Sequence, residues 1–291
     1  MRASGFDSHP AVGLAYSAYV PMFLNKHLDA VDYIEMPFEL LQHNPSVIEI
    51  QRLRPVILHC ASLSMAGFVP PDDLTVESVK FWTEKTKTPW VGEHLAFVTA
   101  EREAADAGDN KNSACDVYDV GYSVNPPMNA ANLQQVLRSV EEYEKRLSVP
   151  VLLENSPVYF VPPGSTMTQI EFIRELCARS SAQLLLDLTH FYITSQTLGF
   201  DPLREIMSLP LDRVVEVHIS GVDMQDGIYW DDHTKRAPEI IYDMLTLVLA
   251  RSSLKAVTLE YNWSARFPEK ALLQEIDRTR EALSTVAWEY V

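Results

Sequence analysis

Eight short apolar runs recur along this chain, and each is followed by a longer segment with helical character. The runs are rich in Val, Ile and Leu, which is typical of parallel strands buried on both faces. They are Val12–Ser17, Tyr33–Phe38, Val56–Ser62, Val91–Phe97, Val151–Asn155, Leu184–Leu188, Val214–Ile219 and Val257–Tyr261. Eight strands that alternate with helices predict a (β/α)8 TIM barrel, and 291 residues suit one such domain. An open doubly wound sheet is the less favoured alternative.

Four of the intervening segments are predicted to be amphipathic helices. Asp73–Lys87 places Leu74, Val79 and Trp82 at helical spacing. Asn132–Leu147 is clearer, because Leu133, Val136, Leu137, Val140 and Leu147 fall on one stripe. Pro238–Ala250 and Glu269–Val286 follow the same pattern. No linker divides the chain, so residues 1–291 are predicted to form a single domain.

The segment Thr99–Asp119 interrupts this pattern. It contains six acidic residues against Arg102 and Lys111, and it directly follows a predicted strand. We expect a long acidic loop at about 99–119, on the C-terminal rim where the active sites of such barrels lie. The segment fits two interpretations, a solvated surface loop and an active-site lid.

Composition excludes several classes of protein. The chain has 24 basic and 40 acidic residues, so the net charge is 24 − 40 = −16, which argues against a nucleic-acid partner. No stretch approaches the ~20 apolar residues of a membrane span, and the first residues lack the apolar run of a signal peptide. Cys60, Cys115 and Cys177 form no CxxC pair and indicate a reducing compartment. We therefore expect a cytoplasmic protein.

The ends of the predicted strands carry a concentration of histidines and carboxylates. Five of the eight histidines and four carboxylates follow six strands on the expected catalytic face. They are His59, His94, Glu154, Asp187, His190, His218, Asp231, His233 and Glu260. Divalent cations would offset the cost of burying so many ionisable groups. Nine ligands exceed the needs of one ion, so we expect two or three, of iron, manganese or zinc.

Other catalytic motifs find little support. The sequence contains no GxGxxG, no P-loop and no GxSxG. Cys60 follows His59 directly, and adjacent residues on a strand point to opposite faces. A Cys–His nucleophile pair is therefore disfavoured here.

Seven motifs in order give the chain a family resemblance. They are LHCASLS, GEHLAF, LLENSP, LLLDLTHFYITS, EVHISG, DDH and LEYNW, between about Gly13 and Trp263. Together they resemble the multinuclear non-heme iron-dependent oxidative enzymes, formerly a domain of unknown function, which include MbnB and TglH. The resemblance implies a barrel that holds two or three iron ions (Fe2+ or Fe3+) through the nine residues above. Glu154 and Asp187 are then the residues expected to bridge or orient the central ions.

The same resemblance implies a reaction. Members use O2 as a cosubstrate to modify a precursor peptide, usually at cysteine, during maturation of ribosomal peptide natural products. A small partner protein commonly recognises the leader of the peptide. The chain departs from the family at Asp187-Leu188-Thr189-His190, where His190 replaces an amide, and at Thr197-Leu198-Gly199. These departures leave the exact reaction open.

A second resemblance competes with the first. Endonuclease IV-type enzymes and the wider xylose-isomerase-like barrels also take His, Glu and Asp ligands from strand ends. Asp187-x-x-His190 and Asp231-x-His233 match the endonuclease pattern, which implies three zinc ions and phosphodiester hydrolysis. The net charge weighs against DNA as substrate. A metal-dependent isomerase, another zinc hydrolase and a non-enzymatic scaffold remain alternatives.

Overall fold

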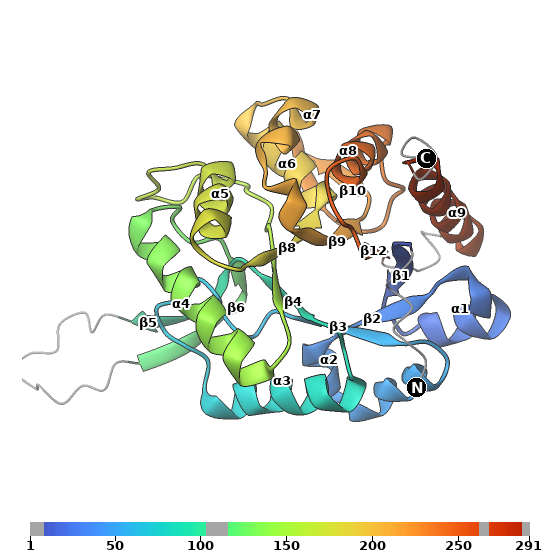
Figure 1. Cartoon of the computed structure of the whole chain (residues 1–291), viewed down its shortest axis with the longest axis horizontal. Coiled ribbons are helices and arrows are strands. Elements are labelled where there is room, and N and C mark those ends of the chain that lie inside the picture. Colours follow the sequence, from blue (N-terminus) through green and yellow to red (C-terminus); the bar gives the residue numbers. More distant parts are fainter. Residues whose placement is uncertain (1–8, 103–115, 262–267, 287–291) are drawn as a thin grey trace, which may run out of the picture.

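The computed structural model describes residues 9–102, 116–261 and 268–286. Within these residues, eight parallel strands close into a barrel that helices surround (Figure 1). The order around the barrel is β1-β12-β9-β8-β7-β4-β3-β2, so neighbours follow one another in the chain apart from two inserted hairpins. The closed barrel confirms the predicted fold class and excludes the open sheet.

Each predicted apolar run overlaps one barrel strand. The strands are β1 (Ala11–Ala15), β2 (Tyr33–Pro37), β3 (Val56–Cys60), β4 (Val91–His94), β7 (Val151–Glu154), β8 (Gln183–Asp187), β9 (Val214–Ile219) and β12 (Ala256–Leu259). Most of their residues are buried, because the barrel interior covers one face and the helices cover the other.

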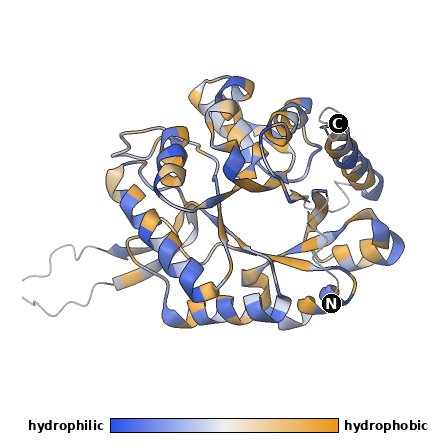
Figure 2. Ribbon diagram, in the orientation of Figure 1, coloured by the Kyte–Doolittle hydropathy of each residue, from blue (hydrophilic) through white to orange (hydrophobic). Residues whose placement is uncertain are grey.

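The helices turn an apolar face toward the barrel and a polar face outward (Figure 2). The α-helices are α1 (Val20–Lys26), α2 (Phe38–His43), α3 (Asp73–Thr86), α4 (Ala130–Leu147), α5 (Gln169–Arg179), α6 (Leu188–Leu198), α7 (Pro202–Glu205), α8 (Glu239–Leu249) and α9 (Glu269–Val286). Short 3-10 helices cover Leu28–Ala30, Pro45–Arg52, Ile206–Ser208 and Leu211–Arg213. The prediction of Leu74 on an apolar stripe is wrong, since its side chain is 81% exposed and Val76 is buried instead.

Two antiparallel hairpins leave the C-terminal end of the barrel. The first pairs β5 (Phe97–Arg102) with β6 (Asp116–Val124). Both ends of the expected loop at 99–119 are therefore strands, while 103–115 lies outside the described residues. The second pairs β10 (Val222–Gln225) with β11 (Ile228–Asp231). Its turn residues Asp226 and Gly227 have φ values of 53° and 81°, as an Asp-Gly hairpin turn requires.

The barrel interior is built in layers, because every second residue of a strand points inward. One layer is an apolar plug that includes Tyr33, Ile57, Leu152 and Leu185. Two residues further along the same strands stand Glu35, His59, Glu154 and Asp187. Residues two positions further along each strand form the next layer toward the C-terminal end, and that layer consists of ionisable groups. Cys60 packs instead in the outer core, beneath the helices.

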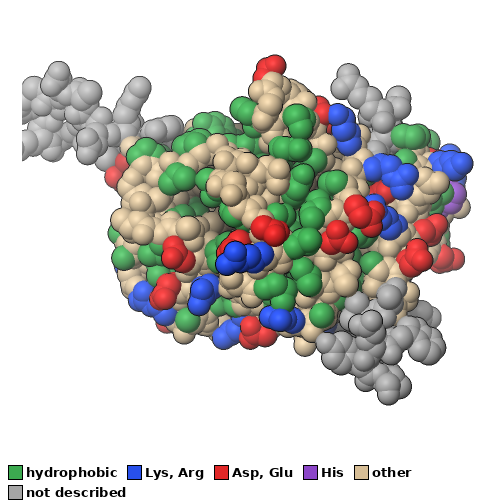
Figure 3. Space-filling view, turned by 90° about the horizontal axis from the view of Figure 1, so that it is seen from above, with side chains coloured by type: hydrophobic (Ala, Val, Ile, Leu, Met, Phe, Trp, Pro, Cys, Tyr) green, Lys and Arg blue, Asp and Glu red, His purple; other side chains and the backbone are tan. Residues whose placement is uncertain are grey.

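Two surface properties bear on possible partners. Acidic and basic side chains are interspersed on the face shown in Figure 3, and neither kind gathers there into one large patch. Among the helices of the described residues, none is long and apolar enough to cross a bilayer.

Candidate metal centre

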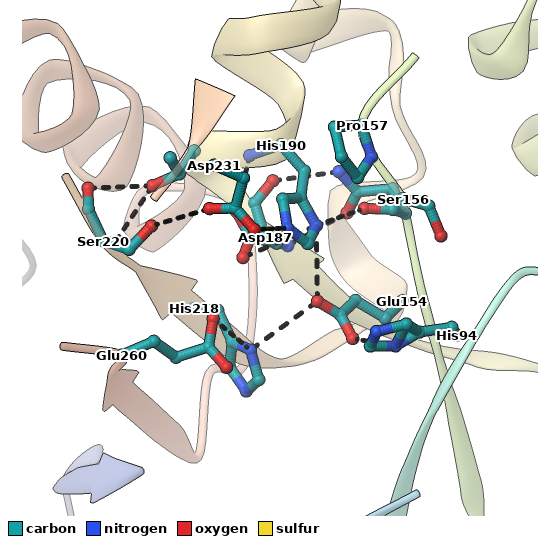
Figure 4. Close-up of polar contacts among 12 residues, drawn as sticks. His94, Glu154, Ser156, Pro157, Asp187, His190, His218, Ser220, Asp231 and Glu260 are labelled. Atoms are coloured by element: carbon teal, nitrogen blue, oxygen red, sulfur yellow. Dashed lines mark hydrogen bonds and ion pairs between the residues drawn. The ribbon is translucent and has the colours of Figure 1, made fainter. Parts of the chain in front are cut away.

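Glu154, at the end of β7, lies at the centre of the ionisable layer (Figure 4). Its Oε2 is 2.7 Å from His59 Nε2 and 2.7 Å from His94 Nδ1. Its Oε1 is 3.4 Å from His190 Nδ1 and 3.7 Å from His218 Nδ1. One buried carboxylate therefore reaches four histidines from four different elements of the barrel.

Gly92 makes room for this arrangement on β4. A Cβ at this position would lie 2.9 Å from His59 Cδ2 and 2.9 Å from Leu185 Cδ1. The absence of a side chain lets the His59 ring enter the barrel beside Glu154.

Asp187 ends β8 and begins α6, which explains the Asp-x-x-His spacing. Its Oδ1 accepts a hydrogen bond from the backbone N–H of His190 at 2.6 Å, as an N-cap does. The cap leaves Oδ2 directed at the centre of the site. Asn155 fixes the other side, because its Nδ2 donates to the Asp187 carbonyl and its Oδ1 accepts from the Asp187 N–H, both at 2.9 Å.

The second hairpin delivers Asp231 and His233 to the same mouth. Asp231 Oδ2 is 3.0 Å from His190 Nε2, and its Oδ1 is 2.7 Å from His233 Nε2. His233 has φ 56°, a left-handed conformation that a non-glycine residue adopts at a cost of about 1–3 kcal/mol. Gly221 brings the hairpin close, since a Cβ there would lie 1.8 Å from the Lys235 carbonyl oxygen.

His218 and Glu260 complete the set of nine predicted residues. His218 Nδ1 lies 3.4 Å from Glu260 Oε2, and His233 Nε2 lies 3.9 Å from the same oxygen. On its other side, His218 Nε2 lies 3.0 Å from Glu35 Oε1. The structure therefore brings together all nine residues that the sequence indicated, and it adds Glu35.

Glu35 was missed because only strand ends were considered, whereas it lies inside β2. A signal was present in the alternation of that strand. Tyr33 and Glu35 are two residues apart and so share a face, and a carboxylate inside an otherwise apolar run is rarely buried without a partner. Asn262, which follows Glu260, lies outside the described residues.

The pKa values in the cluster are set by burial and by the charges of neighbouring side chains. Burial lowers the pKa of His59, but the charges of Glu35 and Glu154 outweigh burial and raise that pKa to about 10. Burial likewise opposes the raised pKa of His233, which Asp231 and Glu260 bring to about 9. Burial raises the pKa of Asp187 to about 7 despite the nearby His190. Cations are therefore favoured beside these carboxylates.

The donor set fits metal ions. Four groups of three residues could each hold an ion, because the ligand atoms within a group lie within 4.8 Å of one another. The groups are Glu35–His59–His218, His59–His94–Glu154, His190–Asp231–His233 and Glu154–Asp187–His218. Several buried atoms here, including Asp187 Oδ2, Glu35 Oε1 and both ring nitrogens of His218, make no hydrogen bond within the part of the chain that the structure describes, and their charged partners lie 3.0–3.7 Å away. Buried polar atoms without hydrogen bonds are costly, and cation binding would satisfy them.

This barrel and cluster can be compared with known proteins. The model of the family described as RiPP precursor modification enzyme MbnB/TglH/ChrH, where RiPP denotes a ribosomally made and modified peptide, matches residues 11–284. The chain belongs to this family. The resemblance drawn from the seven motifs is thereby confirmed.

Two relatives illustrate how widely the sequence varies. A UPF0276 protein of Streptomyces avermitilis is 26% identical over 263 residues, which make up 89% of this chain and 52% of that protein. A UPF0276 protein of Caulobacter vibrioides is 27% identical over 265 residues, which cover 89% of this chain and 88% of the relative. The chain thus spans about half the length of the Streptomyces protein.

Solved structures confirm the type of barrel. A D-tagatose 3-epimerase-like protein matches with a TM-score of 0.59 and 13% identity, over 97% of this chain and 100% of that chain. A xylose isomerase domain containing protein from Salmonella typhimurium matches with a TM-score of 0.58 and 12% identity, over 94% of this chain and 97% of that chain. At such low identity the likeness shows the fold alone, a xylose-isomerase-like TIM barrel.

Proposed function

We propose that the chain is a multinuclear iron enzyme that uses O2 to modify a precursor peptide at a cysteine, a reaction that we expect in the cytoplasm. The observation that carries this proposal is the convergence of nine histidines and carboxylates at one barrel mouth, with buried atoms that make no hydrogen bond among the described residues. The family supports a peptide substrate. Imidazole and carboxylate ligands suit redox-active iron.

Three groups of residues would hold the ions. His59, His94 and Glu154 form one group, and His190, Asp231 and His233 form another. Glu154, Asp187 and His218 form a third group between them, with Glu260 beside His218. Glu154 is the carboxylate that belongs to two of the groups, and its two oxygens could each bind an ion, so we assign it the bridging role. This arrangement supports two or three ions for each chain.

Bound iron would supply electrons for the reduction of O2 and the Lewis acidity that keeps a substrate thiol deprotonated. The residues of the chain prepare that site. Asp187 is held by its cap and by Asn155, so Oδ2 points inward without rearrangement. Asp231 holds His190 and His233 on either side of its carboxylate. Burial of Glu154, Asp187 and His218 excludes water from the base of the site.

We also infer a separate small protein that binds the leader of the precursor, in keeping with the family. Co-purification of this chain with the products of neighbouring genes tests the inference. A stable complex that accelerates modification of the full precursor is expected. Full activity of the chain alone on a peptide without a leader would contradict it.

The requirement for oxygen separates this function from the alternatives. A trinuclear zinc hydrolase or a metal-dependent isomerase would use a similar ligand set but would need no oxidant. The iron-loaded protein should be incubated with the neighbouring precursor peptide and the leader-binding protein, with and without O2, and the peptide mass measured. We expect a mass change only with O2, and none when the target cysteine is replaced by serine. Modification that continues under strict anaerobic conditions would overturn the oxidative assignment.

A further inference from the structure

The mouth of the metal centre opens into a cavity of about 460 Å³ whose outer wall is aromatic. Tyr122 comes from the first hairpin, Tyr159 and Phe160 from the segment after β7, and Trp230 from the second hairpin. We call these four residues the aromatic rim. The side chains of Tyr122, Phe160 and Trp230 are 69%, 65% and 40% exposed. Large apolar groups left exposed at a cavity mouth indicate a binding surface.

The aromatic rim is tied to the candidate metal ligands. The rings of Tyr159 and Trp230 are 4.9 Å apart and tilted by 32°. The Tyr159 hydroxyl accepts a hydrogen bond from the backbone N–H of Asp231 at 3.2 Å. Trp230 directly precedes Asp231 in β11. A side chain that stacks on this pair therefore stands beside the cluster.

Two polar side chains in the same wall each carry a buried oxygen that makes no hydrogen bond among the described residues. Asn125 Nδ2 donates to the Pro157 carbonyl at 2.7 Å, and this bond fixes the orientation of its Oδ1. Asn125 Oδ1 and Ser156 Oγ are buried, and neither has a hydrogen-bond partner among the described residues. Ser156 is more than nine-tenths buried and lies two residues beyond Glu154, near His190 (Figure 4).

We propose that the aromatic rim, with Asn125 and Ser156, is the subsite for the peptide backbone and for an aromatic side chain next to the modified residue. Asn125 Oδ1 accepts a peptide N–H and Ser156 Oγ donates to a peptide carbonyl. One free acceptor and one free donor match a peptide unit, whereas a sugar would present several hydroxyls. The neighbouring aromatic side chain stacks on Trp230 and Tyr159. This inference rests on the proposed peptide substrate and adds its sequence preference.

Binding without turnover tests the subsite directly. Two fluorescein-labelled peptides, Ala-Phe-Cys-Phe-Ala and Ala-Ala-Cys-Ala-Ala, are titrated against the iron-loaded protein under anaerobic conditions and followed by anisotropy. We expect the phenylalanine peptide to bind about fivefold to tenfold more tightly. Trp230→Ala should remove most of this preference and Trp230→Phe should keep it. Ser156→Ala should weaken both peptides by a similar factor.

The matched control is Phe81→Ala, since Phe81 is an aromatic residue of α3 that is 54% exposed and does not line the cavity. This control should leave both affinities unchanged, and metal analysis of Trp230→Ala should show an intact cluster. Equal binding of the two peptides by the wild type, or an undiminished preference in Trp230→Ala, would overturn the proposal. Displacement of the peptide by D-fructose would assign the aromatic rim to a sugar and would also overturn it.

The outcome is separable from that of the proposed function. A preserved aromatic preference without any O2-dependent modification would reject the oxidative function and leave the subsite standing. O2-dependent modification without an aromatic preference would reject the subsite alone.

Discussion

Two neighbouring layers of the barrel interior differ in how their buried carboxylates are bonded. The lower layer is the level of the apolar plug, where Glu216 lies beside Leu185, and the upper layer is the layer of ionisable groups. In the lower layer, Glu216 is fully buried and its oxygens accept hydrogen bonds from Trp90 at 2.6 Å, Thr258 at 2.8 Å and Tyr33 at 3.1 Å. In the upper layer, Asp187 Oδ2 and Glu35 Oε1 are buried and make no hydrogen bond among the described residues, and their ion-pair partners are the rings of His190 at 3.6 Å and His218 at 3.0 Å. The chain itself supplies the hydrogen bonds of the Glu216 carboxylate in the lower layer. In the upper layer, a bound metal ion would satisfy the carboxylate oxygens.

Protonation sets Glu154 apart from the other buried carboxylates. Burial and the charge of Glu35 raise the pKa of Glu216 to about 7, and burial raises the pKa of Asp187 in the upper layer to about 7 as well. Burial also disfavours the charge of Glu154, but His94 and His59 outweigh burial and hold the pKa of Glu154 well below its usual range. The upper layer thus keeps an anion where a metal site needs one.

Replacing Glu154 by alanine should have the largest effect. Two of the candidate groups lose a ligand at once, so activity should fall by more than the ~100-fold typical of an outer partner of a metal site. Metal content measured by mass spectrometry should fall with activity, while far-ultraviolet circular dichroism stays barrel-like. A variant that retains full metal content would contradict the bridging role.

Glu216→Ala should lower the stability of the protein by disrupting the hydrogen bonds of the lower layer. The change removes the acceptor of the Trp90 Nε1–H and the oxygen that accepts from both Thr258 and Tyr33, whose hydroxyls keep a mutual hydrogen bond of 2.7 Å. Each donor that loses its acceptor costs about 1–3 kcal/mol. We expect a loss of about 3 kcal/mol in the free energy of unfolding, measured by urea denaturation of the metal-free protein. Folded Glu216→Ala protein should still bind its metal ions, and loss of metal at unchanged stability would erase the distinction between the layers.

Metal binding should depend on pH in a direction set by the histidines. Charges of neighbouring carboxylates raise the pKa of His59 to about 10 and that of His233 to about 9, against the effect of burial. Both rings are then protonated at pH 7, and a metal must displace the protons. Affinity for Fe2+ should rise by about tenfold per pH unit for each displaced proton. Anaerobic calorimetry in buffers of different ionisation enthalpy measures the protons released, and none released at pH 7 would refute these charge states.

Glu35→Gln should give the smallest effect. The amide keeps the shape of the side chain but removes the charge beside His218 Nε2. Because Glu35 belongs to a single candidate group, with His59 and His218, we expect metal affinity to weaken by about tenfold. Asp119→Asn on β6 provides a surface control that should bind normally. Unchanged affinity in Glu35→Gln would remove Glu35 from the site.

The sequence predicted those parts of the molecule that follow a regular repeat. Apolar runs of β-type residues located all eight barrel strands, and seven of the nine site residues lie at or just after the ends of those strands. Asp231 and His233 come from the second hairpin instead. Glu35 escaped because a strand interior was assumed to be apolar. Leu74 was misplaced because it lies at the first turn of α3, where an apolar residue can face solvent.

The aromatic rim had no comparable signal. Tyr122, Tyr159 and Trp230 come from two hairpins and a connecting segment, so no repeat in the sequence links them, and only the closure of the barrel brings them together. The same holds for the hydrogen bond between Tyr159 and Asp231, whose partners are 72 residues apart. Strands and helices with a regular sequence repeat can be predicted from the sequence. A cavity wall built from two hairpins and a connecting segment cannot.

The number of metal ions bound to each chain tests the central claim most directly. The protein should be produced with ample iron, purified without oxygen and analysed by inductively coupled plasma mass spectrometry against its amino-acid content. The layered interior and the three groups of ligands assigned to the ions predict two or three ions for each chain. No metal, or a single ion at full occupancy, would contradict the account.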